Sequence, residues 1–167
     1  KKRIVSQMSS RDEITINDIS ESLNISIPKA SELLNGLAED GFIKETSKRS
    51  VGQGRKASFY ALRADSYYFL GVEIKKYKIN IGLMGFDKVM VKAKNNIPFL
   101  YKEAGESLTE VLQIINNFLE ETQIERHKIA GLGLSVAGRI NVKTGKILTI
   151  YHFADAPVKD FLEKELG

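Results

Sequence analysis

The feature that most constrains the fold is a pair of short amphipathic helices predicted within residues 15–43. Four apolar residues of the second helix follow the spacing i, i+3, i+4 and i+7, so they share one helical face. They are Ala30, Leu33, Leu34 and Leu37. Asp40 and Gly41 end this helix, with glycine where a left-handed residue is usual. Because only residues 24–26 separate the two helices, the pattern predicts a helix-turn-helix.

Both helices have start signals in the sequence. Thr15 and Asp18 match a capping box in its acidic variant, which would open the first helix. The residues expected to face inward from this helix are Ile16, Ile19 and Leu23. Ser26 is the expected N-cap of the second helix. Pro28 follows in the first turn, where a missing amide costs little because those donors have no intrahelical partner.

The face of the second helix that points away from the apolar residues is small and polar. Side chains of this kind at the front of a second helix suit the reading of base edges in the major groove. The candidate DNA-binding residues of this helix are Ser26, Pro28, Lys29, Ser31, Glu32 and Asn35. The alternative is a solvated face on an ordinary helical hairpin, and the helix pair alone does not separate the two.

A basic loop between two predicted strands follows the helix pair. The strands are residues 42–46 and 58–62, and residues 47–56 between them contain four basic residues, two glycines and no acid. Such a hairpin directly after a recognition helix predicts a winged helix, whose tip can lie along phosphates or enter the minor groove. The candidate contacts of this wing are Lys48, Arg49, Arg55 and Lys56. A solvated loop is the alternative, and the position beside the recognition helix favours DNA contact.

The positive charge of the chain is concentrated at the wing. The 167 residues carry a formal net charge of +4, whereas residues 46–63 contain five basic residues and no acid. The absence of cysteine excludes a disulfide framework and any thiolate metal site within the chain. No apolar run approaches the roughly 18 residues that a membrane-spanning helix needs. We therefore expect a cytoplasmic protein without membrane association. We also expect a fragment, because the sequence begins at Lys1 and stops at Gly167 directly after an amphipathic run.

The pattern changes after the wing. Residues 68–74 and 129–136 are mostly apolar runs of strand length, as in strands covered on both faces. Residues 78–86 alternate like a half-buried strand. Residues 107–119 combine a capping box with an apolar helical face. Together with a predicted last helix that opens at Pro157, this order predicts an α/β sheet layered with helices.

Four segments of the second part resemble the ROK family, the sugar kinases and sugar-responsive repressors built on the actin-like ATPase fold. The segments are residues 70–79, 82–87, 129–140 and 145–148. The winged helix is similar to the DNA-binding domain of the repressor branch. The resemblance implies an α/β protein in which residues 1–64 form a winged helix-turn-helix (α+β) domain. Residues 65–167 would then form the N-terminal portion of an actin-like (ribonuclease H-like) effector domain.

One departure from the family bears on activity. ROK kinases carry an acid followed by Gly-Gly-Thr in the first phosphate loop, where small residues let backbone amides approach the nucleotide phosphates. This chain has Glu73 followed by Lys75, Lys76 and Tyr77, which would crowd that turn. The departure favours a protein that is not an enzyme, with Glu73 as an ion-pair partner of the basic residues. A ROK-type sugar kinase with an accessory N-terminal domain is the alternative.

The resemblance implies a bacterial transcriptional regulator, a repressor of carbohydrate-metabolism genes that binds a double-stranded operator as a homo-oligomer. A sugar or sugar derivative would control it. Gly138 and His152 are the effector-binding candidates, because an Asn that contacts sugar in the family falls near His152. A loop histidine without a ligand role is the alternative there. The zinc site of the family would follow residue 167, so no cofactor is expected within this chain.

A hypothesis from a different functional class is that the winged helix binds another protein, because Glu32 and Glu39 place negative charge on the exposed helix. A salt titration of duplex binding separates the two, since phosphate neutralisation gives a steep loss of affinity with salt.

Overall fold

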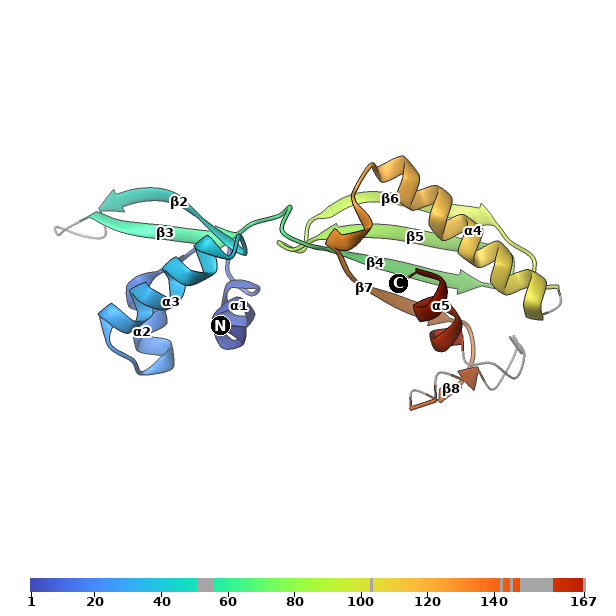
Figure 1. The fold of residues 1–167 in the computed structure, drawn as a ribbon, viewed down its shortest axis with the longest axis horizontal. Coiled ribbons are helices and arrows are strands. Elements are labelled where there is room, and N and C mark those ends of the chain that lie inside the picture. Colours follow the sequence, from blue (N-terminus) through green and yellow to red (C-terminus); the bar gives the residue numbers. More distant parts are fainter. Residues whose placement is uncertain (51–55, 103, 142, 145, 148–157, 167) are drawn as a thin grey trace. The chain divides into compact units, whose positions relative to one another are not determined.

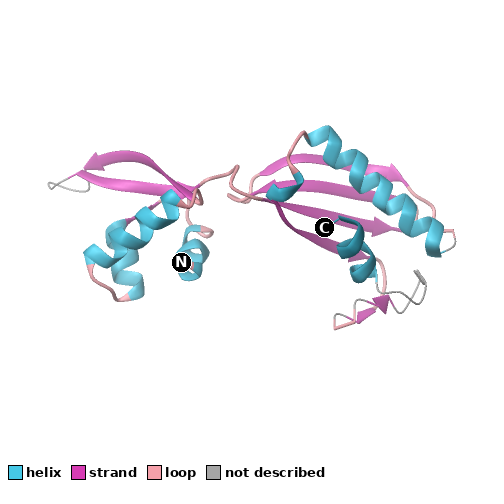
Figure 2. Cartoon of the chain, in the orientation of Figure 1, coloured by secondary structure: helices cyan, strands magenta, loops and turns pink. Residues whose placement is uncertain are grey.

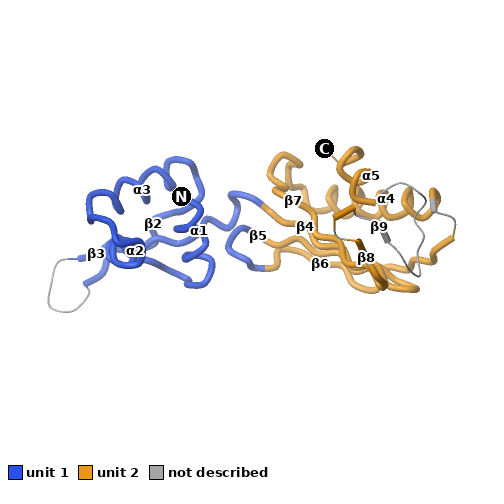
Figure 3. The backbone as a smooth tube through the Cα atoms, turned by 90° about the horizontal axis from the view of Figure 1, so that it is seen from below, with its two compact units in different colours: residues 1–67, 85–89 blue, residues 68–84, 90–167 orange. Residues whose placement is uncertain are grey.

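The computed structural model describes residues 1–50, 56–102, 104–141, 143–144, 146–147 and 158–166. The chain divides into two compact units, which Figure 3 shows in different colours. Unit 1 comprises residues 1–67 and 85–89, and unit 2 comprises residues 68–84 and 90–167. The segment 85–89 is the turn between two strands of unit 2, yet its contacts are with unit 1.

Unit 1 combines three helices with a small antiparallel sheet (Figure 1). Its helices are α1 (Lys2–Met8), α2 (Ile16–Leu23) and α3 (Ile27–Glu39). Its strands are β1 (Ile14–Thr15), β2 (Ile43–Ser50) and β3 (Lys56–Leu62), arranged in the order β1-β3-β2. The predicted helix-turn-helix and hairpin are therefore confirmed. Strand β2 extends beyond the predicted residue 46, because Lys48, Arg49 and Ser50 pair with the start of β3.

The core of unit 1 is made by the predicted inner faces of the helices. Ala30, Leu34 and Leu37 of α3 are buried, and Leu33 is half-buried at the edge of the same cluster. The remaining buried residues of this core come from all the other elements of the unit: Ile4, Met8, Ile14, Ile19, Ile43, Tyr60 and Leu62. The burial of apolar surface drives this packing, because each Å² removed from water stabilises the folded state by about 25 cal/mol. The stripe that defined the second helix in the sequence thus fixes which face of α3 remains outside.

Unit 2 is a four-stranded sheet with two helices (Figures 1 and 2). Its elements are β4 (Tyr68–Lys75), β5 (Lys78–Gly85), β6 (Met90–Pro98), α4 (Ala104–Thr122), a 3₁₀ turn η1 (Arg126–Lys128), β7 (Ile129–Val136), β8 (Ile140–Asn141), β9 (Lys146–Ile147) and α5 (Val158–Leu166). The sheet order is β6-β5-β4-β7, and β8 and β9 form a separate pair. Strands β4 and β7 are parallel, with α4 in the connection between them, which gives the predicted α/β arrangement.

Only one face of this sheet is covered by the described residues. Leu70, Val72 and Ile74 of β4 are buried in a core with α4 and α5, whereas the alternating residues Phe69 and Gly71 are exposed. The expectation that β4 and β7 are covered on both faces is therefore wrong for this part of the chain. The apolar run of β4 arises because Phe69 and Gly71 occupy the outward positions of an ordinary half-buried strand.

The open face forms a shallow groove of about 790 Å³. Its lining is mainly apolar and includes glycines from three strands, Gly71, Gly82 and Gly133, beside Phe69 and Met90. No helix among the described residues is both long enough and apolar enough to cross a membrane.

Candidate nucleic-acid interface

The two helices of the helix-turn-helix begin at side-chain caps. Thr15 and Asp18 form the predicted capping box: the Thr15 amide donates to the Asp18 carboxylate at 2.7 Å, and the Asp18 amide donates to the Thr15 hydroxyl at 3.2 Å. Ser26 caps α3 by accepting from the Lys29 amide at 3.4 Å, and Pro28 lies in the first turn. These contacts satisfy amides that have no partner within their own helix.

The turn between α2 and α3 and the end of α3 are held by backbone geometry. Asn24 closes α2 in the left-handed conformation, with φ of 52°. The Ser20 hydroxyl donates to the Ile25 carbonyl at 2.6 Å across the turn. At the other end of α3, Gly41 has φ of +78°, which permits the Phe42 amide to donate to the Leu37 carbonyl at 3.0 Å. Because both ends are fixed, the outer face of α3 has a defined orientation within unit 1.

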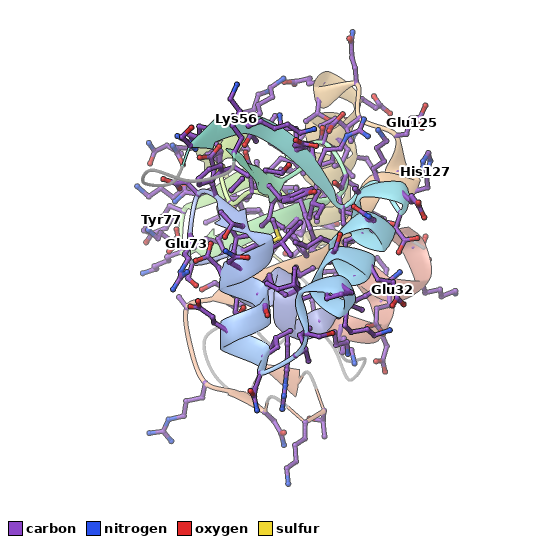
Figure 4. All side chains as sticks on the ribbon, turned by 90° about the vertical axis from the view of Figure 1, so that its left-hand side faces the viewer. Glu32, Lys56, Glu73, Tyr77, Glu125 and His127 are labelled. Carbon is purple, nitrogen blue, oxygen red and sulfur yellow. The ribbon has the colours of Figure 1, made fainter. Side chains whose placement is uncertain are left out.

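The outer face of α3 carries the predicted contact residues. Ser26, Pro28, Lys29, Glu32 and Asn35 are exposed, and Ser31 is half-buried. Figure 4 shows Glu32 projecting from this helix. The Lys29 ammonium lies 2.8 and 2.9 Å from the two carboxylate oxygens of Glu32, so these two charges compensate each other. The predicted contact residues thus carry no net charge, and they offer amide, hydroxyl and carboxylate groups, which are the groups that pair with base edges.

The wing is the β2–β3 hairpin, and its predicted cations differ in their surroundings. Lys48 lies 3.5 Å from Glu45 on the same strand. Arg49 forms an ion pair with Glu13, and its guanidinium carbon lies 4.0 Å from the centroid of the Phe59 ring. Lys56 is exposed at the start of β3 (Figure 4), and no ion pair found among the described residues involves it. Arg55 lies outside the described residues.

An aromatic cluster supports the base of the wing in unit 1. Phe42, which directly precedes β2, stacks on Tyr67 with ring centroids 5.7 Å apart and contacts Phe86 at 5.9 Å. Tyr67 and Phe86 meet edge to face at 6.3 Å. The Phe86 amide donates to the Ala64 carbonyl at 3.0 Å, which fixes the 85–89 turn in this cluster. Sequence reasoning missed this cluster, because its three rings are separated by 25 and 19 residues along the chain.

The predicted effector residues are only partly described. Gly138 follows β7, is exposed and has φ of +139°, a conformation that favours glycine. His152 lies outside the described residues.

The turn between β4 and β5 is occupied by large polar side chains. Glu73 forms the predicted ion pair with Lys75 at 3.1 Å and accepts from the Asn80 amide group at 2.7 Å. The hydrogen bond from Asn80, followed by the one from Lys75, lowers the pKa of Glu73. Tyr77 is 63% exposed, and the Lys76 ammonium lies 4.9 Å from its ring centroid. Glu73 is thus held as a charged partner of its neighbours.

Comparisons with known proteins agree with this geometry. Residues 1–44 match a family model described as winged helix-turn-helix DNA-binding. No curated protein sequence matches the chain. A crystal structure of a ROK family transcriptional regulator, a homologue of the E. coli MLC protein, matches 90% of this chain with a TM-score of 0.63 and 15% sequence identity. The chain spans 39% of the length of that protein.

The first unit is therefore a winged helix-turn-helix, of the class that the matching family model describes as DNA-binding. The chain as a whole has the fold of the corresponding part of a ROK family transcriptional regulator. The predicted fold class, an α/β protein with an N-terminal winged helix-turn-helix, is confirmed.

Proposed function

We propose that this chain is part of a sequence-specific DNA-binding transcriptional regulator. The observation that carries the proposal is the pairing, within one unit, of a hydrogen-bonding face on α3, whose predicted contact residues carry no net charge, with a basic hairpin. Base contacts give sequence choice, whereas cations on a wing give affinity for the phosphates. The family match over residues 1–44 and the fold shared with a ROK family regulator support this assignment.

We further propose that the regulator is a repressor of carbohydrate-metabolism genes. The support is the resemblance of unit 2 to the opening of the ROK effector domain, with its actin-like fold. A sugar or sugar derivative would bind the effector domain, with Gly138 and His152 as candidate contacts. Such a regulator would act as a homo-oligomer on two half-sites of an operator in the bacterial cytoplasm.

We propose no enzymatic activity for this protein. A kinase must place ATP phosphates against backbone amides, and phosphoryl transfer depends on that placement. The turn after β4 instead carries Lys75, Lys76 and Tyr77, and the neighbouring Glu73 is engaged by Lys75 and Asn80. Positive charge at this turn attracts anions, but bulky side chains occupy the place where close backbone approach is required.

Duplex binding across a series of salt concentrations tests the DNA-binding proposal. Fluorescence anisotropy with a mixed-sequence duplex gives the association constant at each concentration. Each neutralised phosphate contributes about −0.9 to the slope of log K against log salt. If Lys48 and Lys56 both contact phosphates, the slope is about −1.8 or steeper. Absence of binding, or binding without salt dependence, would favour the protein-interaction module instead.

A further inference from the structure

Glu13, a residue that no DNA-binding prediction included, lies at the centre of a contact network on the wing. It precedes β1, and its side chain is 31% exposed. The Thr46 hydroxyl lies 2.5 Å from its Oε1 atom and 3.2 Å from the carbonyl oxygen of Phe59. The other carboxylate oxygen of Glu13 forms the ion pair with Arg49. Two residues of β2 thus hold one carboxylate from outside the hairpin.

Arg49 is held from a second side by an aromatic ring. Its guanidinium carbon lies 4.0 Å from the Phe59 ring centroid, within the range of a cation–π interaction. The side chain nevertheless remains 54% exposed, and a guanidinium has five N–H donors, of which Glu13 uses only part. The cation is therefore close to solvent but compensated in the protein without DNA.

The other described wing cations are compensated less completely. Lys48 has a 3.5 Å contact with Glu45, on its own strand and without an aromatic partner among the contacts of the described residues. Lys56 takes part in none of the ion pairs found in the described ranges. A compensated cation neutralises an approaching phosphate less completely, because a carboxylate already occupies the place that the phosphate would take. Fewer of the cations condensed on the DNA are then released.

We propose that Glu13 restrains the affinity of the wing for DNA of arbitrary sequence, because its carboxylate withholds Arg49 from the phosphates. The proposal rests on the proposed function, since it presumes that the wing meets duplex DNA. The exposed donors of Arg49 can reach a phosphate, but the phosphate replaces Glu13 as the counter-charge of the guanidinium only by displacing an anchored carboxylate. Glu13 therefore lowers the affinity for mixed-sequence DNA.

The size of the effect follows from counterion release. Freeing Arg49 adds about one phosphate contact, so the salt slope becomes steeper by about 0.9. At 0.1 M salt, this corresponds to about an eightfold higher affinity for mixed-sequence DNA if the affinity extrapolated to 1 M salt is unchanged. If Glu13 acted only through its negative charge, it would repel DNA from the whole surface. Its effect on DNA affinity would then not depend on the presence of Arg49.

The experiment is a double-mutant cycle read by anisotropy with a mixed-sequence duplex. Glu13→Gln is made in the parent protein and in Arg49→Ala. Asp12→Asn is the matched control, because Asp12 is the exposed neighbour of Glu13, has no ion pair among the described residues and gives the same change in net charge. Thr46→Val, which removes the hydroxyl beside Glu13, is a second route to the same release with a smaller expected gain.

The proposal predicts that Glu13→Gln raises affinity about eightfold and steepens the slope by about 0.9 beyond the effect of Asp12→Asn, and that both gains vanish in Arg49→Ala. Equal effects of Glu13→Gln and Asp12→Asn, or a gain that persists without Arg49, would overturn it while leaving the proposed function intact. A parent protein that does not bind the duplex would overturn both. If Glu13→Gln fails to fold, the result for Thr46→Val decides: no gain in affinity overturns the proposal.

Discussion

Asn35→Ala tests whether α3 selects the DNA sequence. Asn35 is exposed on the outer face of α3 and has no hydrogen bond to another described residue. Its side chain therefore contributes little to the folded state, and the substitution removes an amide without opening a cavity. An asparagine that pairs with both edge atoms of an adenine contributes about 1–3 kcal/mol of discrimination. We expect the ratio of operator to mixed-sequence affinity to fall roughly 5- to 150-fold.

The assay needs an operator, which binding selection from a pool of random duplexes provides. Anisotropy then gives the affinity of the parent and of Asn35→Ala for the selected duplex and for a mixed-sequence duplex at one salt concentration. The mixed-sequence affinity should be unchanged within about twofold, because Asn35 is uncharged and sequence-independent binding is electrostatic. A full specificity ratio in both Asn35→Ala and Ser31→Ala would show that another element reads the bases.

Three further predictions concern the wing, the helix caps and one carboxylate. Lys56→Ala should weaken operator and mixed-sequence binding alike and flatten the salt slope by about 0.9, and an unchanged slope would remove Lys56 from the interface. In urea denaturation, Thr15→Ala should cost more stability than Ser26→Ala within the roughly 0.5–2 kcal/mol of cap substitutions. The Thr15 hydroxyl accepts from the Asp18 amide at 3.2 Å and donates to the Asp18 carboxylate at 2.6 Å, whereas the Ser26 hydroxyl accepts from the Lys29 amide at 3.4 Å; the reverse order would contradict this geometry. Lys94, followed by Lys92, lowers the pKa of Glu121 against an opposing effect of desolvation, so NMR should detect titration below the ordinary glutamate range. The ion pairs of Glu121 stabilise the fold above the pKa that this carboxyl has in the unfolded state, and the stabilisation is lost as the pH falls through its folded pKa. A titration midpoint of Glu121 that does not rise in Lys94→Ala would refute the assignment.

Local signals were sufficient to predict the helix-turn-helix. The capping residues of α2 and α3 bond to groups only a few residues away, so spacing alone predicts their roles. These residues are Thr15, Asp18, Ser26 and Gly41. The inner face of α3 was predictable for the same reason, because helical periodicity assigns faces without knowledge of the tertiary contacts.

Contacts between distant residues were not predictable. Glu13 and Arg49 are 36 residues apart, and nothing in a single sequence pairs a particular acid with a particular base at that separation. The same holds for the Phe42, Tyr67 and Phe86 rings. The apolar run of β4 led to the wrong prediction that both faces of this strand are covered. The number of covered faces depends on what packs against Phe69 and Gly71 and not on their apolarity.

The most direct test of the central claim places a cleavage reagent on α3. The sequence contains no cysteine, so Glu39→Cys gives a single attachment point for an iron chelate on an exposed residue of this helix. If α3 enters the major groove, the label should cut the selected operator at a few adjacent nucleotides in each half-site, and excess mixed-sequence duplex should not abolish the cuts. Cleavage scattered evenly along the operator, or no cleavage while the labelled protein stays bound, would contradict the assignment of α3 as the recognition helix.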